Sequence, residues 1–481
     1  MKLSNSYFKL GKDFYKEQFP DIIKNPDLII FNKKLASKLQ LEVSPDEIVD
    51  IFSGNKLLKK TKPIALAYCG HQFGNFVPTL GDGRAVLLTE IEDKHNNLYD
   101  IQLKGSGRTY FSRSGDGKCP LDAGIREYLV SEAMHFLNIR TTRSLALINS
   151  DEIIQRENLV PASIITRIAA SHIRIGTFEY FAAREDDKNL EKLAKYSLKR
   201  HYPKSLNKKT DNLYLELLRQ VIKSQAELVA SWMSIGFIHG VMNTDNTAIS
   251  GQTIDYGPCA FMDQYQHDQC YSFIDRYGRY NYSNQRKIIH WNLVKCAESL
   301  LTLIDEDQRQ AVYLAEKELN KFPQIFEKYY LKKMASKLGI FNHKTSDKLL
   351  INEFLNILEI NKIDFTNGFR ILSKILTSKA KFYDNSKDFN KWRKTWLERV
   401  KSQNLTIESI AEKMDKINPI LIPRNHIIAE IISQAVDKND FSKFHQYLKL
   451  LENPFTELKE FSNYYLPPTE KQIVPNTFCG T

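Results

Sequence analysis

The sequence has few cysteines and no close pairs of them. Its six cysteines are spread over 481 residues without a CxxC pair or a Cys/His cluster of zinc spacing, so neither a disulfide scaffold nor a structural zinc module is expected. The chain also lacks an N-terminal segment of signal-peptide type and any run of about 18 apolar residues, the length that spans a bilayer. We therefore expect a soluble, cytoplasmic protein with no membrane partner.

Positive charge is in excess but is not concentrated. The chain has 68 Lys and Arg against 57 Asp and Glu, a net charge of +11, and 42% hydrophobic residues, which is an ordinary globular composition. A positive charge favours acidic partners in general, but the densest lysine clusters have no interleaved aromatic side chains on which bases could stack. We expect no nucleic-acid partner. The length allows about three domains or one large two-lobed enzyme.

Glycine is concentrated in one part of the chain, where sharp turns and close backbone approaches are expected. Nine of the 20 glycines lie between residues 70 and 124: Gly70, Gly74, Gly81, Gly83, Gly105, Gly107, Gly115, Gly117 and Gly124. Around them the pattern predicts a β-hairpin of strands 85–91 and 98–104, and a helix over 122–137. Two further strands are predicted at 144–148 and 162–168, divided by a polar turn at 149–151.

Beyond residue 176 the pattern becomes helical. Segments 213–233 and 308–338 repeat apolar residues every three or four positions, and the latter half contains few glycines. These features predict an α+β fold with a strand-rich N-terminal lobe, a large helical C-terminal lobe and a cleft between them. The predicted division is a nucleotide-binding lobe at 1–170, a helical lobe with the catalytic segment at 171–440, and a tail at 441–481 that contains Cys479.

Two glycine-rich segments are candidates for phosphate binding. In Leu80-Gly81-Asp82-Gly83-Arg84 the glycines would let backbone amides approach a phosphate, and the arginine would add a charge; the alternative is a hairpin turn. A second segment runs from Lys104-Gly105-Ser106 to Asp116-Gly117-Lys118. It is neither a Walker A loop nor a dinucleotide-binding fingerprint.

Charged residues in predicted strands and helices are further candidates for phosphate binding. Kinase-like folds hold a nucleotide phosphate with a strand lysine that meets a helical glutamate, and Lys104 and Glu127 are candidates for that pair; the alternative is two unrelated surface residues. Arg167 and Arg174 lie among apolar and small residues, where each needs an anion or a structural carboxylate partner. His172, between them, is expected to be a core residue.

The most specific segment runs from His239 to Asn246 and is followed by Asp255-Tyr256-Gly257. Kinases use HRDxxxxN and then DFG, where the Asn and the second Asp hold Mg²⁺ and the first Asp accepts the hydroxyl proton. The spacing from histidine to asparagine is kept, but Val241 replaces the first aspartate. Because valine cannot accept a proton, either the protein is inert or the neighbouring Asp245 serves as base.

These residues in this order resemble the selenoprotein O family, also called YdiU, whose members are protein adenylyltransferases on a protein-kinase-like fold. The resemblance covers nearly the whole chain. It runs from about Phe31-Asn32 through Asn418-Pro419 and Arg424-Asn425 to the C-terminal cysteine. The segments specific to it are Gly70-His71-Gln72-Phe73-Gly74, Leu80–Ala85, Arg126–Met134 and His239–Asn246.

The resemblance implies transfer of AMP from ATP, bound in a flipped orientation relative to kinases, to Ser, Thr or Tyr hydroxyls of target proteins, with pyrophosphate leaving. It implies that Mg²⁺, or Mn²⁺, is held by Asn246 and Asp255 and that Asp245 is the general base. The residues implied to contact the nucleotide are Gly81, Gly83, Arg84, Lys104, Asp116, Gly117, Glu127, Arg167, Arg174 and Asp255. Transfer of UMP from UTP, a conventional protein kinase and an inert nucleotide-binding scaffold stay open as alternatives.

The sequence departs from the family pattern at Tyr110, where proline is usual, and at Lys118, where arginine is common. Family members often carry selenocysteine or cysteine near the C-terminus, and Cys479 holds that place here. We hypothesise a regulatory disulfide between Cys479 and Cys270, with a free thiol as the alternative. The target proteins and the oligomeric state are not determined by the sequence; a monomer is our expectation.

Overall fold

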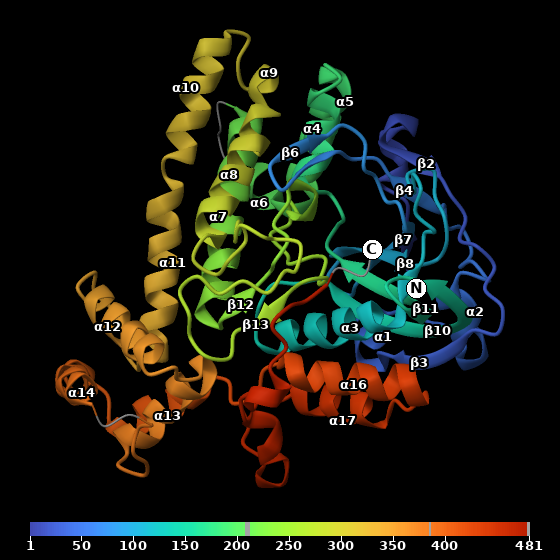
Figure 1. The fold of residues 1–481 in the computed structure, drawn as a ribbon. Helices are drawn as coiled ribbons and strands as arrows, with labels where there is room; N and C mark the ends of the chain where they lie inside the picture. Colours follow the sequence, from blue (N-terminus) through green and yellow to red (C-terminus); the bar gives the residue numbers. More distant parts are fainter. Residues whose placement is uncertain (207–211, 384–385, 479–481) are drawn as a thin grey trace.

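The computed structural model describes residues 1–206, 212–383 and 386–478, and it combines a large antiparallel sheet with many helices (Figure 1). The predicted mixed α+β class is confirmed. The nine-stranded sheet has the order β2-β4-β7-β8-β11-β10-β3, with β1 paired to β7 and β9 paired to β11. Its strands are β1 Leu3–Ser4, β2 Tyr15–Glu17, β3 Asp27–Phe31, β4 Ile64–Leu66, β7 Ala85–Glu92, β8 Leu98–Lys104, β9 Cys119–Pro120, β10 Arg143–Gln155 and β11 Leu159–Ala169.

Two short two-stranded sheets lie outside this sheet: β5 Gly70–Gln72 with β6 Asn75–Val77, and β12 Phe237–Ile238 with β13 Ala260–Phe261. The α-helices are α1 Lys33–Lys38, α2 Ile48–Ser53, α3 Leu121–Phe136, α4 Ile175–Ala182, α5 Asp187–His201, α6 Pro203–Leu206, α7 Leu213–Ser234, α8 Gln285–Glu298, α9 Leu301–Ile304, α10 Gln308–Leu319, α11 Phe322–Lys337, α12 Asp347–Ile360, α13 Phe365–Leu376, α14 Lys387–Lys401, α15 Ile407–Asp415, α16 Asn425–Lys438 and α17 Ser442–Leu451. In the described part of the chain, no helix is both long and apolar enough to cross a membrane.

The predicted hairpin of the glycine-rich region is confirmed as β7–β8, and the predicted helices at 122–137 and 213–233 are α3 and α7. The predicted turn at 149–151 is wrong. Strands β10 and β11 continue past it, and the polar residues occupy an irregularity in the pairing between Asn149 and Ile153. A β-bulge tolerates an unpaired residue without ending the strand, so a polar cluster there resembles a turn in the sequence.

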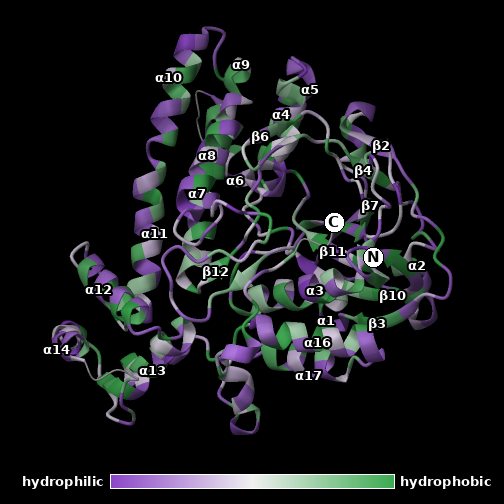
Figure 2. Cartoon of the chain, in the orientation of Figure 1, coloured by the Kyte–Doolittle hydropathy of each residue, from purple (hydrophilic) through white to green (hydrophobic). Residues whose placement is uncertain are grey.

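The predicted long helix at 308–338 is two helices, α10 and α11. Pro323 lies in the first turn of α11, where its missing N–H costs nothing, whereas inside a continuous helix it would break a hydrogen bond. Both helices alternate hydrophilic and hydrophobic segments along their length (Figure 2). Helix α11 packs against α7.

Helix α3 lies at the centre of the fold. One side packs on β10 and β11, and the other is covered by α16 and α17, which lie beside it in Figure 1. Its side chains Tyr128, Leu129 and Met134 are fully buried, and the Tyr128 ring meets Phe444 of α17 with centroids 5.7 Å apart. The C-terminal helices therefore pack against the same helix that carries Glu127. The domain division given above stays a prediction.

Arg424, just before α16, ties the C-terminal helices to the middle of the chain. Its side chain is completely buried and forms ion pairs with Asp263 and with Asp364, the latter at 2.8 Å. The next residue, Asn425, accepts a hydrogen bond from Arg126 of α3 at 2.8 Å. The Arg424-Asn425 segment is therefore a structural connection between three distant parts of the sequence.

We predict that Arg424→Ala lowers the free energy of unfolding by about 3 to 5 kcal/mol, because it leaves two carboxylates without their buried partner. Urea denaturation measures this change, and hydrogen exchange should accelerate in α16. The control is Lys374→Ala, which removes an exposed ion pair with Glu457 and should cost less than about 1 kcal/mol. Equal effects of the two substitutions would contradict the prediction.

Candidate active site

Four charged side chains meet where the sheet, α3 and the Asp255 segment come together. Lys104 is the last residue of β8, and Arg167 of β11 pairs across the sheet with Gln102. Because residues two apart on a strand share a face, Lys104 and Arg167 project on the same side of the sheet, toward Glu127 of α3. Glu127 accepts from Lys104 at 2.7 Å and from Arg167, whose Nη2 lies at 3.0 Å.

Asp255 completes this group. Its Oδ1 lies 3.2 Å from Lys104 Nζ and 3.3 Å from Arg167 Nη2. The side chains of Lys104, Glu127 and Arg167 are only 3–6% exposed, whereas that of Asp255 is 22% exposed. The Lys104–Glu127 pair predicted from the sequence is confirmed as a contact, and the alternative of two surface residues is wrong.

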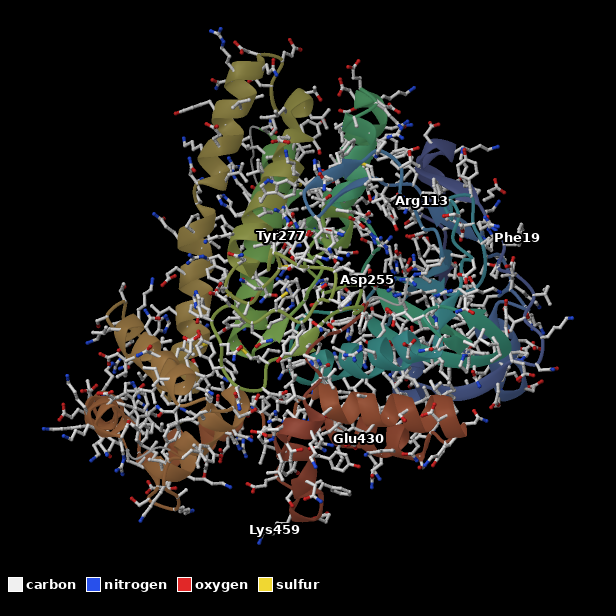
Figure 3. All side chains as sticks on the ribbon, viewed as in Figure 1. Phe19, Arg113, Asp255, Tyr277, Glu430 and Lys459 are labelled. Atoms are coloured by element: carbon white, nitrogen blue, oxygen red, sulfur yellow. The ribbon has the colours of Figure 1, made fainter. Side chains whose placement is uncertain are left out.

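The two carboxylates are held ionised. Burial raises the pKa of Glu127, but Arg167 and Lys104 outweigh it and bring that pKa down to about 2. Burial likewise opposes ionisation of Asp255, but Lys104 and Arg167 hold its pKa well below its usual range. Asp255 also has a φ of +66°, a left-handed conformation that costs energy for a residue with a side chain. Figure 3 shows it between the strand-rich and helical parts of the molecule.

A cavity of about 600 Å³ is lined by residues of both predicted glycine-rich segments. Six of the predicted site residues line it, together with Gln72 and the rings of Tyr68 and Phe111: Gly81, Gly83, Arg84, Asp116, Gly117 and Asp245. At Gly81, with a φ of +65°, an added Cβ would lie 2.2 Å from the Phe111 ring. Strands β6 and β7 on either side of this loop do not pair, so the alternative of a hairpin turn is wrong.

Asp245 lies in a 3-10 turn, η4 (Thr244–Asn246), and is 7% exposed. Burial raises its pKa to about 6 despite the opposing charge of Arg174. Its Oδ1 has no hydrogen-bond partner. Because Asp245 also lines the cavity, its carboxylate can accept a proton or a hydrogen bond from a molecule that enters.

Asn246 and Asp255, which are predicted to hold a cation, lie close together in the sequence. The amide nitrogen of Asn246 donates to the carbonyl of Val241 at 3.1 Å, which leaves Oδ1 of its side chain for another partner. Among the described residues, no three His, Cys, Asp or Glu side chains come together to hold a metal alone. The donor set of Asn246 and Asp255 nevertheless fits Mg²⁺, which prefers oxygen and is commonly bound by one or two protein side chains plus substrate phosphates.

Arg174 and Asp116 have protein partners already. The Arg174 guanidinium lies 4.3 Å from the centre of the Tyr68 ring and 3.6 Å from Asp82 Oδ1, while its Nε has no partner. Asp116 accepts two hydrogen bonds from Arg156, at 2.7 and 3.0 Å. His172 is a buried core residue that bonds Asp100, as expected. Gln72, His71 and Glu179 contact the Asp245 turn or each other, and no sequence pattern predicted a role for them.

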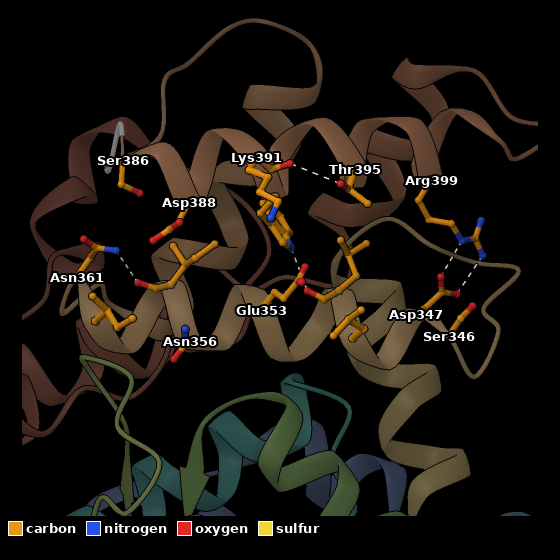
Figure 4. A pocket seen from close by; sticks show the side chains of 15 residues that line it. Ser346, Asp347, Glu353, Asn356, Asn361, Ser386, Asp388, Lys391, Thr395 and Arg399 are labelled. Carbon is orange, nitrogen blue, oxygen red and sulfur yellow. Dashed lines mark hydrogen bonds and ion pairs between the residues drawn. The ribbon is translucent and has the colours of Figure 1, made fainter.

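A second cavity, of about 540 Å³, lies between α12 and α14 and contains none of the predicted site residues (Figure 4). The charged residues Arg399 and Asp347 in its wall already pair with each other, since Arg399 donates two hydrogen bonds to the Asp347 carboxylate at 2.7 and 3.0 Å. The proposed Cys479–Cys270 disulfide stays a hypothesis, because Cys479 lies outside the described residues. Cys270 is half-buried, and burial and Asp275 raise its thiol pKa to about 11.

We predict that Glu127→Gln lowers the free energy of unfolding at neutral pH by about 3 kcal/mol, because Arg167 and Lys104 lose their main buried counter-charge. The matched control is Asp116→Asn, which weakens an ion pair whose carboxylate is 44% exposed and should cost less than about 1 kcal/mol. Urea denaturation of both variants measures the difference. Similar stability of wild type and Glu127→Gln would show that the buried ion pairs contribute little.

Known proteins resemble this chain over nearly its whole length. Residues 1–452 match the family model described as protein adenylyltransferase SelO. The chain is 46% identical over 487 residues to the protein nucleotidyltransferase YdiU of Maridesulfovibrio salexigens, covering 100% of this chain and 98% of that protein. It is 45% identical over 488 residues to the protein of the same name from Agrobacterium fabrum, covering 100% of both. The predicted resemblance and enzyme class are confirmed. The chain belongs to the SelO family of nucleotidyltransferases.

Proposed function

We propose that this chain transfers AMP from ATP to Ser, Thr or Tyr hydroxyls of target proteins and that the reaction depends on Mg²⁺, for which Mn²⁺ can substitute. The observation that carries the proposal is the position of Asp245. Its buried carboxylate has an oxygen without a partner and lines the same cavity as the glycine-rich loop. In this proposal the sheet and the helices form a kinase-like two-lobed arrangement around that cavity.

Each charged residue has a part in the proposed reaction. Asp245 accepts the proton of the attacking hydroxyl while the hydroxyl oxygen of the target protein forms a bond to the α-phosphorus of ATP. The bond from that phosphorus to the bridging oxygen breaks, and pyrophosphate leaves with the electron pair. The cation held by Asn246 and Asp255 would neutralise phosphate charge. Lys104, Arg167 and Arg174 supply positive charge for the phosphates, and Glu127 orients the first two.

The pocket residues hold the nucleotide. Gly81 and Gly83 let backbone approach a phosphate, Arg84 adds a charge, and Asp116 and Gly117 line the same cavity. With ATP flipped relative to kinases, the α-phosphate faces the base. A γ-phosphoryl transfer is disfavoured because Val241, buried at 5% exposure, stands where kinases have the proton acceptor. Use of UTP is a variant of the same chemistry, and an inert scaffold would have little need of the Asn246 and Asp255 pair.

We predict that wild-type protein incubated with Mg²⁺ and ATP labelled at the α-phosphorus transfers label to casein or to its own hydroxyls, whereas ATP labelled at the γ-phosphorus transfers none. Asp255→Ala should abolish transfer, because it removes a charged ligand of the cation. Gel autoradiography measures both labels. Transfer of the γ-label would establish a kinase instead, and ATP binding without any transfer would favour the scaffold.

We further predict that Asp245→Asn lowers kcat by about 10²- to 10⁴-fold and changes the Kd for ATP by less than about threefold, because asparagine keeps the shape but cannot accept the proton. Calorimetry gives the Kd, and pyrophosphate release gives kcat. A wild-type kcat for this variant would remove Asp245 from the mechanism.

A further inference from the structure

The Gly70–Val77 hairpin, β5 with β6, lies directly on the turn that carries Asp245. The backbone N–H of His71 donates to Thr244 Oγ1 at 2.7 Å, and that of Phe73 donates to Asn243 Oδ1 at 3.1 Å. Asn243 and Thr244, at the start of the turn, thus accept hydrogen bonds from His71 of β5 and from Phe73, which follows that strand. This places the hairpin in a fixed register against the turn, although the two are some 170 residues apart in the sequence.

Gly70 sets how close the Asp245 side chain comes to the hairpin. A Cβ at this position would lie 2.7 Å from Asp245 Oδ1 and 2.9 Å from Asp245 Cβ, closer than real side chains approach. The carboxylate therefore packs directly on the backbone of Gly70. No other residue type fits here unless the Asp245 side chain moves, so the glycine helps to define its rotamer.

Gln72 contacts the opposite oxygen of the same carboxylate. Its Nε2 donates to Asp245 Oδ2 at 3.4 Å, and both side chains line the 600 Å³ cavity. The bond is long, as hydrogen bonds to catalytic groups often are before substrate binds. With Oδ2 engaged by Gln72, Oδ1 is the oxygen left without a partner.

The hairpin is anchored on its other side by a buried pair. His71 Nδ1 lies 2.5 Å from Glu179 Oε1 of α4, and the Glu179 side chain is 5% exposed. The His71 ring also packs edge-on against Trp291 of α8, with centroids 5.2 Å apart. These contacts hold the strand that carries Gln72 against two helices, so the amide group of Gln72 is presented from a rigid support.

We propose that Gln72 is a positioning residue for Asp245: the Gly70–Val77 hairpin clamps the carboxylate, with Oδ1 packed on the Gly70 backbone and Oδ2 held by the Gln72 amide. This proposal rests on the proposed function, in which Asp245 is the base. A carboxylate without such a support samples several rotamers, and small displacements of a catalytic group lower the rate strongly.

The test compares Gln72→Met, which keeps the length but removes the donor, with Asn75→Ala, which changes an exposed side chain of the same hairpin. We expect Gln72→Met to lower kcat for pyrophosphate release roughly 10- to 100-fold, with KM for ATP and the melting temperature unchanged. Gly70→Ala should lower kcat similarly by displacing the carboxylate, and Asn75→Ala should leave it unchanged. A Gln72→Met enzyme with wild-type kcat, or with a raised KM for ATP and unchanged kcat, would overturn the proposal.

Crystal structures of wild type and Gln72→Met give a readout that does not depend on activity. The expected result is a single Asp245 rotamer in the wild type and a rotated or split carboxylate in the variant. If wild-type protein transfers no nucleotide, the proposed function fails, and the structures alone decide whether Gln72 positions Asp245. An Asp245 side chain that keeps its position in Gln72→Met would overturn the positioning role in either case.

Discussion

The site depends on the buried meeting of two cations and two carboxylates: Lys104 and Arg167 with Glu127 and Asp255. Each charge would be costly in the protein interior alone, and the four together are close to neutral. Because the four residues come from β8, β11, α3 and the segment after β12, the network fixes the sheet, the central helix and the Asp255 segment relative to one another. Only Asp255 keeps substantial exposure, since 22% of its side chain is accessible.

Two further connections support this centre from outside. Arg424 joins the C-terminal helices to Asp263 and Asp364, and those helices pack on the back of α3 opposite the sheet. On the other side, the Gly70–Val77 hairpin is held between α4 and the Asp245 turn. Asp245, the proposed base, and the charged network are therefore placed by segments from nearly the whole length of the chain. This explains why the family pattern extends from the N-terminal third to Arg424-Asn425.

Local patterns in the sequence predicted many of the strands, helices and site residues, and they missed others for physical reasons. Alternating and helical periodicity located β7, β8, α3 and α7, and motif spacing selected Lys104, Glu127, Asn246 and Asp255. The turn at 149–151 and the unbroken helix at 308–338 were wrong, because a bulge and a helix start contain the same residue types as a loop or a helix interior. Gln72 and Glu179 had no predicted role, since their contacts to Asp245 and His71 join residues more than 100 positions apart.

A crystal structure of the protein with a non-hydrolysable ATP analogue and Mg²⁺ tests the nucleotide orientation most directly. We predict the α-phosphate nearest to Asp245, the terminal phosphates at Arg167 and Arg174, and the cation between Asn246 and Asp255. A γ-phosphate nearest to Asp245, with the adenine where the terminal phosphates are expected, would contradict nucleotidyl transfer and indicate kinase chemistry.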